Sequence, residues 1–318
     1  MTDPRKHEKY DALIAACRAL PPVRTAIAHP CDDASLTAAS DAARAGIIDP
    51  VLVGPQARIR ALAATLGIDL AGVKIVDTPH SHASAAKAVE MVRAGEADAL
   101  MKGSLHTDEL MAEVVHKDTG LCTGRRISHV FIMDVPTYPK PLFITDAAVN
   151  ISPTLEDKAD IARNAIELAQ ALGIARPKVA ILSAVETVTS KIPSTIDAAA
   201  LCKMAERGQI TGGILDGPLA LDNAISPEAA AMKQIESPVA GDADILLVPD
   251  LESGNMLAKE LTFLANADAA GIVLGARVPI ILTSRADNVR ARMASCAVAA
   301  LYAHARRNAA AEAGKLAG

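Results

Sequence analysis

The stretch "DPVLVGPQARIRALAATLG", residues 49–67, joins a run of β-type residues to a segment of helical spacing across one Gly-Pro step. Its uninterrupted Val-Leu-Val is typical of a strand that is covered on both faces. The same order recurs on either side in three further pairs: "RTAIAHP" with "DASLTAASDAARAG", "VKIVDT" with "SHASAAKAVEMVRAG", and "DALMKG" with "HTDELMAEVVH". Strands that alternate with helices in this way predict a mostly parallel sheet in a layered α/β fold.

The alternation breaks between residues 127 and 145. Two β-type runs, Ile127–Val135 and Pro141–Thr145, flank a Pro-rich turn, which predicts a hairpin or an antiparallel excursion. A second round of strands and helices follows. One helix is predicted to begin after the cap Thr154 and to end at Gly173, and a later one to begin near Gly254.

A chain of 318 residues exceeds what one hydrophobic core usually fills, so we expect two domains. We assign residues 1–145 plus 271–318 to a first α/β domain and residues 146–270 to a second α/β domain. The pattern alone does not decide whether the last segment returns to the first domain.

The composition is that of a globular protein, with 51% hydrophobic and 22% charged residues. Aromatic residues make up only 2%, the net charge is −5, and the pI is near 5.9. Nucleic-acid surfaces need basic faces and often aromatic stacking platforms, so we expect no nucleic acid as a partner. An anionic small-molecule substrate would have to be bound by locally arranged Arg and Lys.

The N-terminal residues mix both charge signs, and no stretch approaches the roughly 20 apolar residues of a membrane span. We therefore expect a cytoplasmic protein without a membrane partner. The five cysteines are scattered, and no C-x-x-C pair occurs, which predicts neither a disulfide framework nor a zinc site. Cys122, in a Gly-rich loop, is the one cysteine that we consider as a nucleophile.

Polar residues follow several of the predicted strands, and ligands of open α/β sheets bind beyond the carboxyl ends of strands. These residues are Lys102, Ser104, His106, Asp146, Asn150, Asp216, Asp250, Asn255, Ser284 and Arg285. Neither a G-x-G-x-x-G after a strand nor a P-loop occurs, which disfavours a standard Rossmann dehydrogenase or nucleoside triphosphatase. The carboxylates of residues 242–252 lack a His partner, so we predict no metal site.

Ser284 and Arg285 stand at the join between an apolar run and a helical segment. The N–H groups of a helix N-terminus attract an anion, Ser adds a donor, and a guanidinium holds two phosphate oxygens. From this turn alone, a Ser cap beside a surface Arg explains the pattern equally well.

Six segments carry a family resemblance, which runs from about residue 98 to residue 299. They read "MKGSLHTDEL", "RRISHVFIMDVP", "TDAAVNISPTLEDK", "KMAERGQITGGILDGPLALDNAIS", "SPVAGDADILLVPDLESGNMLAKEL" and "VPIILTSRAD". Together they resemble the phosphate acetyltransferase and phosphate butyryltransferase family, nearer to the butyryl type. They also resemble the acyltransferase half of bifunctional enoyl-CoA hydratase/phosphate acetyltransferase proteins.

The resemblance implies reversible transfer of a short acyl group between coenzyme A and inorganic phosphate. Coenzyme A would be a substrate, and no permanently bound cofactor is implied. The implied fold is two three-layer α/β/α domains with mostly parallel sheets, an isocitrate-dehydrogenase-like architecture with the active-site cleft between the domains. The resemblance further implies a homodimer and the return of the C-terminal segment to the first domain.

Site residues follow from the family motifs. Ser284 would bind the acyl or thiol end and Arg285 the phosphate. The basic residue before "ISHVF" falls on Arg126, with Arg125 as its rival in "GRR". We add Lys102, which could reach a phosphate.

His106 and Asn255 are further substrate-binding candidates at strand ends. His106 is also a remote candidate for the base that deprotonates the CoA thiol, although a capping His is the commoner case. Asn255, with Asp216, would shape the cleft from the second domain.

Two positions depart from the acetyl-specific relatives. Where those carry an acidic residue proposed as the base for the CoA thiol, this chain has Ala291, and where they carry an Arg it has Thr262. The nearer base candidate is then Asp287, whose spacing from Ser284 suits a capping contact equally well.

Because no cysteine lies beside a His-bearing motif, we predict direct transfer in a ternary complex. The alternatives are a metal- and NAD-dependent decarboxylating dehydrogenase of the same architecture and a catalytically degenerate CoA-binding protein.

Overall fold

The computed structural model describes residues 8–282 and 288–316. Its contacts divide the chain into two compact units. Unit 1 is Arg126–Ala269 with the N-terminal residues up to Lys9, and unit 2 is Tyr10–Arg125 with Ala270–Gly318. The predicted domains change at residues 145–146 and 270–271, so the hairpin that the first domain was to include lies in unit 1. The domain division itself stays a prediction.

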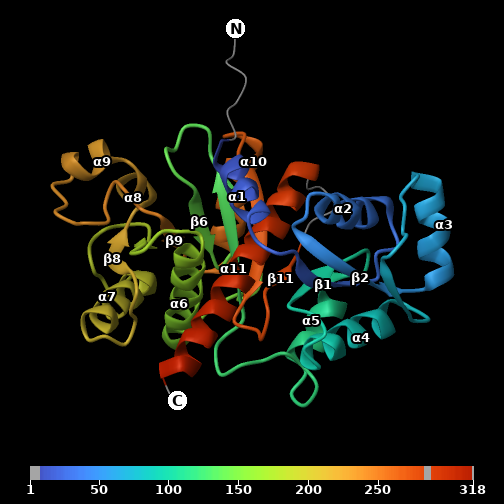
Figure 1. Cartoon of the computed structure of the whole chain (residues 1–318). Helices are drawn as coiled ribbons and strands as arrows, with labels where there is room; N and C mark the ends of the chain where they lie inside the picture. The colour runs from blue at the N-terminus through green and yellow to red at the C-terminus, as the bar shows by residue number, and fades with distance from the viewer. Residues whose placement is uncertain (1–7, 283–287, 317–318) are drawn as a thin grey trace, which may run out of the picture. The chain divides into compact units, whose positions relative to one another are not determined.

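Unit 2 is built on four strand-and-helix pairs and a C-terminal segment (Figure 1). Its strands are β1 (Val23–Ala28), β2 (Ile48–Gly54), β3 (Lys74–Asp77), β4 (Ala99–Lys102), β10 (Asp268–Leu274) and β11 (Ile280–Ile281). Its helices are α1 (Glu8–Arg18), α2 (Asp33–Arg44), α3 (Gln56–Leu66), α4 (Ser81–Arg93), α5 (Thr107–Val115) and α11 (Val289–Leu316).

The strand order in unit 2 is β3-β2-β1-β4-β11-β10. All neighbours run parallel except β10 and β11, which pair antiparallel. Helix α2 contacts β2 and α11, whereas α4 contacts β1 and α5, so the sheet is covered on both faces (Figure 1). This confirms the mostly parallel, covered sheet that the continuous apolar strands predict.

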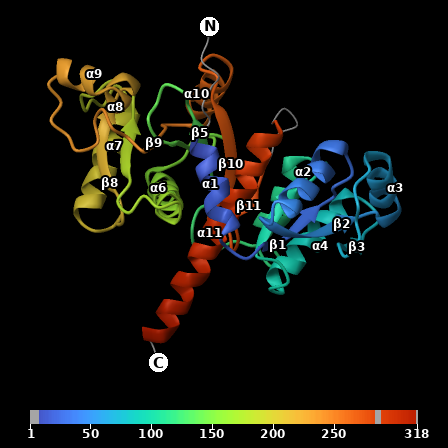
Figure 2. The same cartoon turned by 45° about the horizontal axis from the view of Figure 1, so that its top comes forward.

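Unit 1 contains a shorter sheet with helices that pack along it (Figure 2). Its strands are β5 (Ser128–Asp134), β6 (Leu142–Thr145), β7 (Lys178–Leu182), β8 (Ile214–Leu219) and β9 (Ile245–Leu247). Its helices are α6 (Leu155–Ala171), α7 (Pro193–Glu206), α8 (Leu221–Ile225), α9 (Pro227–Met232) and α10 (Leu251–Phe263).

The strand order in unit 1 is β5-β6-β9-β7-β8. Strands β5 and β6 form the predicted antiparallel hairpin, in which Val130 lies opposite Thr145. The other pairs are parallel. Helices α6 and α7 lie side by side in Figure 2 and contact each other. The whole is the α/β fold expected from the sequence.

Helix α6 begins as predicted, and α10 does not. Thr154 and Asp157 form a capping box at the start of α6. Helix α10 begins at Leu251, before the predicted start near Gly254, because Asp250 caps it by accepting the N–H of Ser253 at 2.8 Å. Gly254 lies inside the first turns, where a Cβ would stand 2.7 Å from Val248 Cγ2. Close packing therefore explains this glycine better than a helix boundary does.

The buried core is aliphatic, as the composition predicts. In unit 1 it includes Ile144, Ala180 and Leu246, all with no exposed surface. Among the described residues, no helix is long and apolar enough to cross a membrane.

Candidate functional site

The carboxyl edge of the sheet in unit 2 has a switch point between β1 and β4, because the chain leaves β1 toward β2 on one side and reaches β4 on the other. Beyond the strand ends, the backbone N–H of Gly103 donates to Ala28 O at 2.8 Å. Ser104 donates both its backbone N–H and its hydroxyl to His29 O, each at 2.9 Å. The two turns are thus fastened at the place where ligands of such sheets bind.

Gly103 makes this close approach possible. A Cβ at this position would lie 2.4 Å from Ala28 O and 2.5 Å from His29 O, both of which are backbone atoms. A side chain at residue 103 would therefore separate the two turns.

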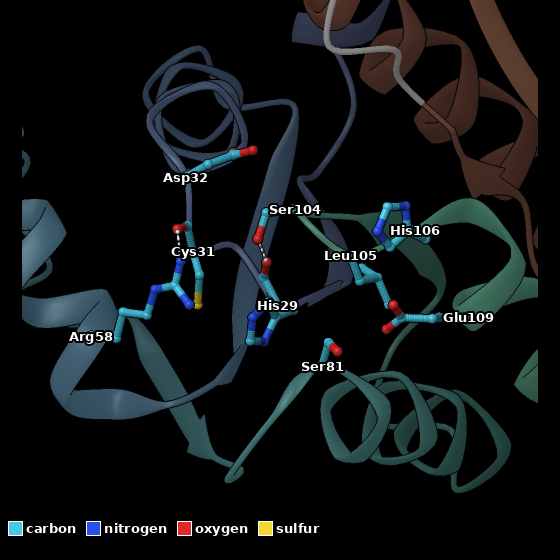
Figure 3. A pocket seen from close by; sticks show the side chains of 9 residues that line it. All are labelled: His29, Cys31, Asp32, Arg58, Ser81, Ser104, Leu105, His106 and Glu109. Atoms are coloured by element: carbon cyan, nitrogen blue, oxygen red, sulfur yellow. Dashed lines mark hydrogen bonds between the residues drawn. The ribbon is translucent and has the colours of Figure 1, made fainter.

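A cavity of about 540 Å³ opens at this edge (Figure 3). It is lined by His29, Cys31, Asp32, Arg58, Ser81, Ser104, Leu105, His106 and Glu109. Asp32 and His106 are the N-cap residues of α2 and α5, and Ser81 is the first residue of α4. Three helix N-termini thus border one cavity, which favours an anionic group there.

The charges in the cavity have both signs. In Figure 3, Arg58 and Glu109 stand on opposite sides, with His29 between them. The Oε2 atom of Glu109 is buried and has no hydrogen-bond partner. His29 is only 8% exposed, and its Nδ1 lies 3.1 Å from Ser84 Oγ. Burial, followed by the charge of Arg58, lowers the pKa of His29, which keeps this imidazole neutral at pH 7.

Two predicted residues lie on the turn after β4. Lys102 Nζ donates to Gly103 O at 3.2 Å and to Leu105 O at 3.3 Å, so that the half-buried ammonium lies over its own turn. His106 is exposed and lines the cavity, and its side chain makes no cap hydrogen bond. Neither the hydrogen bonds of Lys102 nor the position of His106 assigns a reaction step to these residues.

Ser284, Arg285 and Asp287 lie outside the described residues. The strand before them, β11, runs parallel to β4, with Ile281 opposite Met101. The chain therefore leaves β11 at the same edge of the sheet at which Lys102 ends β4.

The helix that follows begins at Val289. Asn288 supplies its cap, because Asn288 Oδ1 accepts the N–H of Ala291 at 2.7 Å. Ala291 is 4% exposed, and its methyl group cannot act as a base.

In unit 1 the guanidinium of Arg126 is held at the start of the hairpin. Its Nε donates to Asn150 Oδ1 at 2.6 Å and lies 3.5 Å from Asp157 Oδ1. Its backbone N–H donates to Asp160 Oδ2 at 2.9 Å, and its carbonyl accepts from Asn164 Nδ2 at 2.9 Å. The side chain of Arg126 is nonetheless 53% exposed, so part of the guanidinium faces solvent.

Asp146 organises the turn after β6. This residue is 2% exposed, and its carboxylate accepts the backbone N–H groups of Ala148, Val149 and Asn150 at 2.9, 3.1 and 3.1 Å. It also accepts Asn150 Nδ2 at 2.5 Å. Asp146 thus holds Asn150, which holds Arg126.

The other predicted residues fall into different places. Asn255 Nδ2 donates to Ala147 O at 3.1 Å, so that α10 is fastened to the same turn. Arg125 is half-buried, and its backbone N–H donates to Thr123 Oγ1 at 3.2 Å within unit 2. Thr262 Oγ1 donates to Ala258 O in its own helix. Asp216 accepts the N–H of Gly217.

The sequence did not point to a second cavity, of about 620 Å³, at the ends of β7 and β9 in unit 1. Lys158 lines it, although this lysine is only 6% exposed, and Lys158 Nζ lies 2.6 Å from Asp197 Oδ2. His29, Arg58 and Glu109 were likewise missed. The one usable signal for His29 was a polar residue directly after a strand.

The sequence of this chain is similar to those of known phosphate acyltransferases. The family model described as "Phosphate acetyl/butaryl transferase" matches residues 82–300. A phosphate acetyltransferase from Rhizobium meliloti is 67% identical over 96% of this chain and 96% of its own length. A phosphate butyryltransferase from Clostridium acetobutylicum is 42% identical over 93% of this chain and 98% of its own.

A solved structure described as a branched-chain phosphotransacylase, from Enterococcus faecalis V583, is 31% identical with a TM-score of 0.76. The match covers 89% of this chain and 99% of that one. The model match and these identities bear out the resemblance seen in the motifs: this chain belongs to the phosphate acetyl/butyryl transferase family.

Proposed function

We propose that this phosphate acyltransferase transfers an acetyl group between coenzyme A and inorganic phosphate, and that Arg126 binds the phosphate. The observation that carries the proposal is the half-exposed guanidinium of Arg126, which is anchored through Nε alone to Asn150. A guanidinium held through Nε keeps its two terminal nitrogens for the oxygens of a phosphate.

In the proposed reaction a phosphate oxygen attacks the thioester carbonyl, the C–S bond breaks, and CoA leaves as a thiolate that takes up a proton. In reverse, the thiolate attacks the carbonyl of acetyl phosphate, and the C–O bond to phosphate breaks. Both directions pass through an oxyanion, which positive charge and N–H donors stabilise.

Ser284 and Arg285 receive their roles from the family motif. Ser284 would donate a hydrogen bond to the acyl or thiol end, and Arg285 would bind a phosphate oxygen. Both residues lie outside the described part of the chain, and their roles rest on the motif alone.

The CoA side of the reaction is assigned to the same edge. The cavity of unit 2, with three helix N-termini and Arg58, suits a phosphate group of CoA, and Glu109 Oε2 could accept a hydroxyl or amine donor of the ligand. Lys102 and His106 lie on the turn beside it. CoA is a substrate in this proposal, and no permanently bound cofactor is needed.

Four of the five cysteines support direct transfer rather than an acyl-enzyme. Burial raises the pKa of the Cys17 thiol to about 11 and of the Cys202 and Cys296 thiols to about 12, and it raises the pKa of Cys31 as well. Such thiols stay protonated and are poor nucleophiles. Cys122 is exposed, and its Sγ lies 3.9 Å from Val114 O.

The base for the CoA thiol is assigned to Asp287 or, more remotely, to His106. A free thiol with a pKa of about 8.5 is only ~3% thiolate at pH 7, so a base or a positive field would help. Asn288 provides the cap of α11, and Asp287 lies outside the described residues, so its role as the base stays a prediction.

The acyl group is proposed to be acetyl. The relative named as an acetyltransferase shares 67% identity with this chain and the one named as a butyryltransferase 42%, whereas the motifs read nearer to the butyryl type. Release of CoA from acetyl-, propionyl- and butyryl-CoA at fixed phosphate tests this, with the largest kcat/KM expected for acetyl-CoA. A preference for butyryl-CoA would overturn it.

Incubation with acetyl phosphate alone, followed by mass spectrometry, tests direct transfer. The mass is expected to stay unchanged, and an acetyl adduct would contradict the proposal.

We further propose a cytoplasmic homodimer, as the family resemblance implies. Analytical ultracentrifugation should then return twice the chain mass of 32.9 kDa.

A further inference from the structure

We propose that Asn150 is a positioning residue for the phosphate-binding guanidinium, with Asp146 as the group that fixes its amide. The inference rests on the proposed role of Arg126. It adds two residues that touch no substrate and that hold Arg126 in the orientation a phosphate needs.

The amide of Asn150 is fully used. Its Nδ2 donates to Asp146 Oδ2 at 2.5 Å and to Ile127 O at 2.9 Å, and its Oδ1 accepts from Arg126 Nε at 2.6 Å. Both acceptors of Nδ2 lack a hydrogen to give, so the amide cannot be turned around without setting its oxygen against two other oxygens. Its one acceptor therefore points at Arg126.

Asp146 cannot move to release Asn150. Asp146 is 2% exposed, and its carboxylate is held by three backbone N–H groups of its own turn. Asn150 is also 2% exposed. The rigid, buried pair of Asp146 and Asn150 therefore holds the exposed guanidinium of Arg126 in one orientation.

Arg126 has a second possible partner, the carboxylate of Asp157, and the contact with Asn150 keeps the guanidinium from pairing with it. Asp157 Oδ1 lies 3.5 Å from Arg126 Nε, and Asp157 Oδ2 accepts the N–H of Thr154 at 3.0 Å in the capping box of α6. Without the oxygen of Asn150, the guanidinium can turn to pair fully with this carboxylate. A paired guanidinium offers fewer donors to phosphate.

Substitution of Asn150 by Asp gives a signature that a merely structural role would not give. The introduced carboxylate would keep an acceptor for Arg126 but would face the carboxylate of Asp146. Two adjacent carboxylates hold one proton between them, and its pKa is raised. While the shared proton is bound, the hydrogen bonds that link Asp146 through residue 150 to Arg126 are kept. When it is lost at higher pH, the two carboxylates repel each other.

The expected pH dependence of Asn150→Asp would come from the new carboxylate pair and not from groups already present around it. The charged groups in contact with Arg126 are Asp157 and Asp160 of α6, and the titratable His129 of β5 interacts electrostatically with Asp146. Burial lowers the pKa of His129 to about 4, so it stays neutral across the range tested. Asp250 caps α10, and its Oδ1 accepts from Ser253.

The experiment measures kcat/KM for phosphate from pH 6 to pH 8 in the wild type, Asn150→Asp, Asn150→Leu and the matched control Asn223→Asp. Asn223 is a fully buried asparagine of unit 1 outside both proposed sites. Thermal unfolding verifies that each variant is folded.

For Asn150→Leu we expect kcat/KM for phosphate to fall by 10-fold or more, with KM for acetyl-CoA within twofold of wild type. For Asn150→Asp we expect the ratio of variant to wild-type kcat/KM to fall at least fivefold from pH 6 to pH 8. The ratio for Asn223→Asp should stay level.

If Asn150→Leu does not fold, the pH series of Asn150→Asp still decides. A level ratio for Asn150→Asp, or an equal loss toward both substrates, would overturn the positioning role. Absence of phosphate-dependent turnover in the wild type would instead refute the proposed function, so the two failures are distinguishable.

Discussion

Arg126 Nε and Asn150 Oδ1 lie 2.6 Å apart at the edge of the sheet in unit 1, and the guanidinium beyond this contact is exposed. It involves one of the two neighbours that the sequence left as rivals for the phosphate, and the choice between Arg126 and Arg125 stays a prediction. Arg126 ends a buried chain of hydrogen bonds that starts at Asp146, whereas Arg125 belongs to the other compact unit.

Substitution of Arg126 by Gln should raise KM for phosphate and lower kcat/KM by about 10- to 100-fold, because a charged hydrogen bond contributes roughly 1.5–3 kcal/mol. KM for acetyl-CoA should change little. Steady-state kinetics with phosphate varied at saturating acetyl-CoA measures the effect. Arg125→Gln is the control, and a larger loss in this variant than in Arg126→Gln would move the clamp to Arg125.

Arg285→Ala should lower kcat/KM for phosphate by about 10²-fold or more if, as the family motif implies and we propose, its guanidinium binds the phosphate. The measurement is the same phosphate titration, with Arg292→Ala as a control on the adjoining helix. An unchanged value for Arg285→Ala would remove this residue from the site.

Gly103→Ala should destabilise the protein by about 1–3 kcal/mol, because the added Cβ overpacks against two backbone oxygens that cannot yield without moving a turn. Equilibrium urea unfolding gives the change. Gly124→Ala is the matched control, since no atom lies within 4 Å of a Cβ built there, and it should stay within about 0.5 kcal/mol of wild type. Equal stability of the two variants would refute the tight approach of β1 and β4.

His129 should make the protein less stable in weak acid. Burial lowers its pKa from 6.5 to about 4, so the folded protein binds no proton there where the unfolded chain does. The unfolded state binds more protons between these values, and the free energy of unfolding therefore falls as pH drops from 6.5 toward 4. The full contribution is about 3 kcal/mol.

The measurement for His129 is urea unfolding of the wild type and of His129→Leu at pH 7 and at pH 5. The variant lacks this titration and should lose less stability on acidification than the wild type does. Parallel losses in both proteins would show that His129 is not responsible.

Local features of the fold were predictable from the sequence because short segments encode them. The capping box of Thr154 and the hairpin of β5 and β6 follow from caps, turn residues and apolar runs. The start of α10 was misplaced because Gly254 is a weak helix former, and its place is explained by packing against Val248, which no local pattern records.

The site was harder to predict because its contacts join distant segments. His29 follows β1, whereas Arg58 and Glu109 lie in the first turns of α3 and α5, so the three line one cavity only in the folded unit. Lys158 reads as a solvated charge in its helix, and only the structure shows its burial beside Asp197. Asn150 was visible as a polar residue after a strand, but its tie to Arg126 was not.

The most direct test of the central claim is the rate of CoA release from acetyl-CoA as phosphate is varied, with acetyl phosphate measured in the same reaction. We expect release to depend on phosphate with saturation, and one acetyl phosphate to form for each CoA. CoA release at the same rate without phosphate, or no release at any phosphate concentration, would contradict the assignment of this protein as a phosphate acyltransferase.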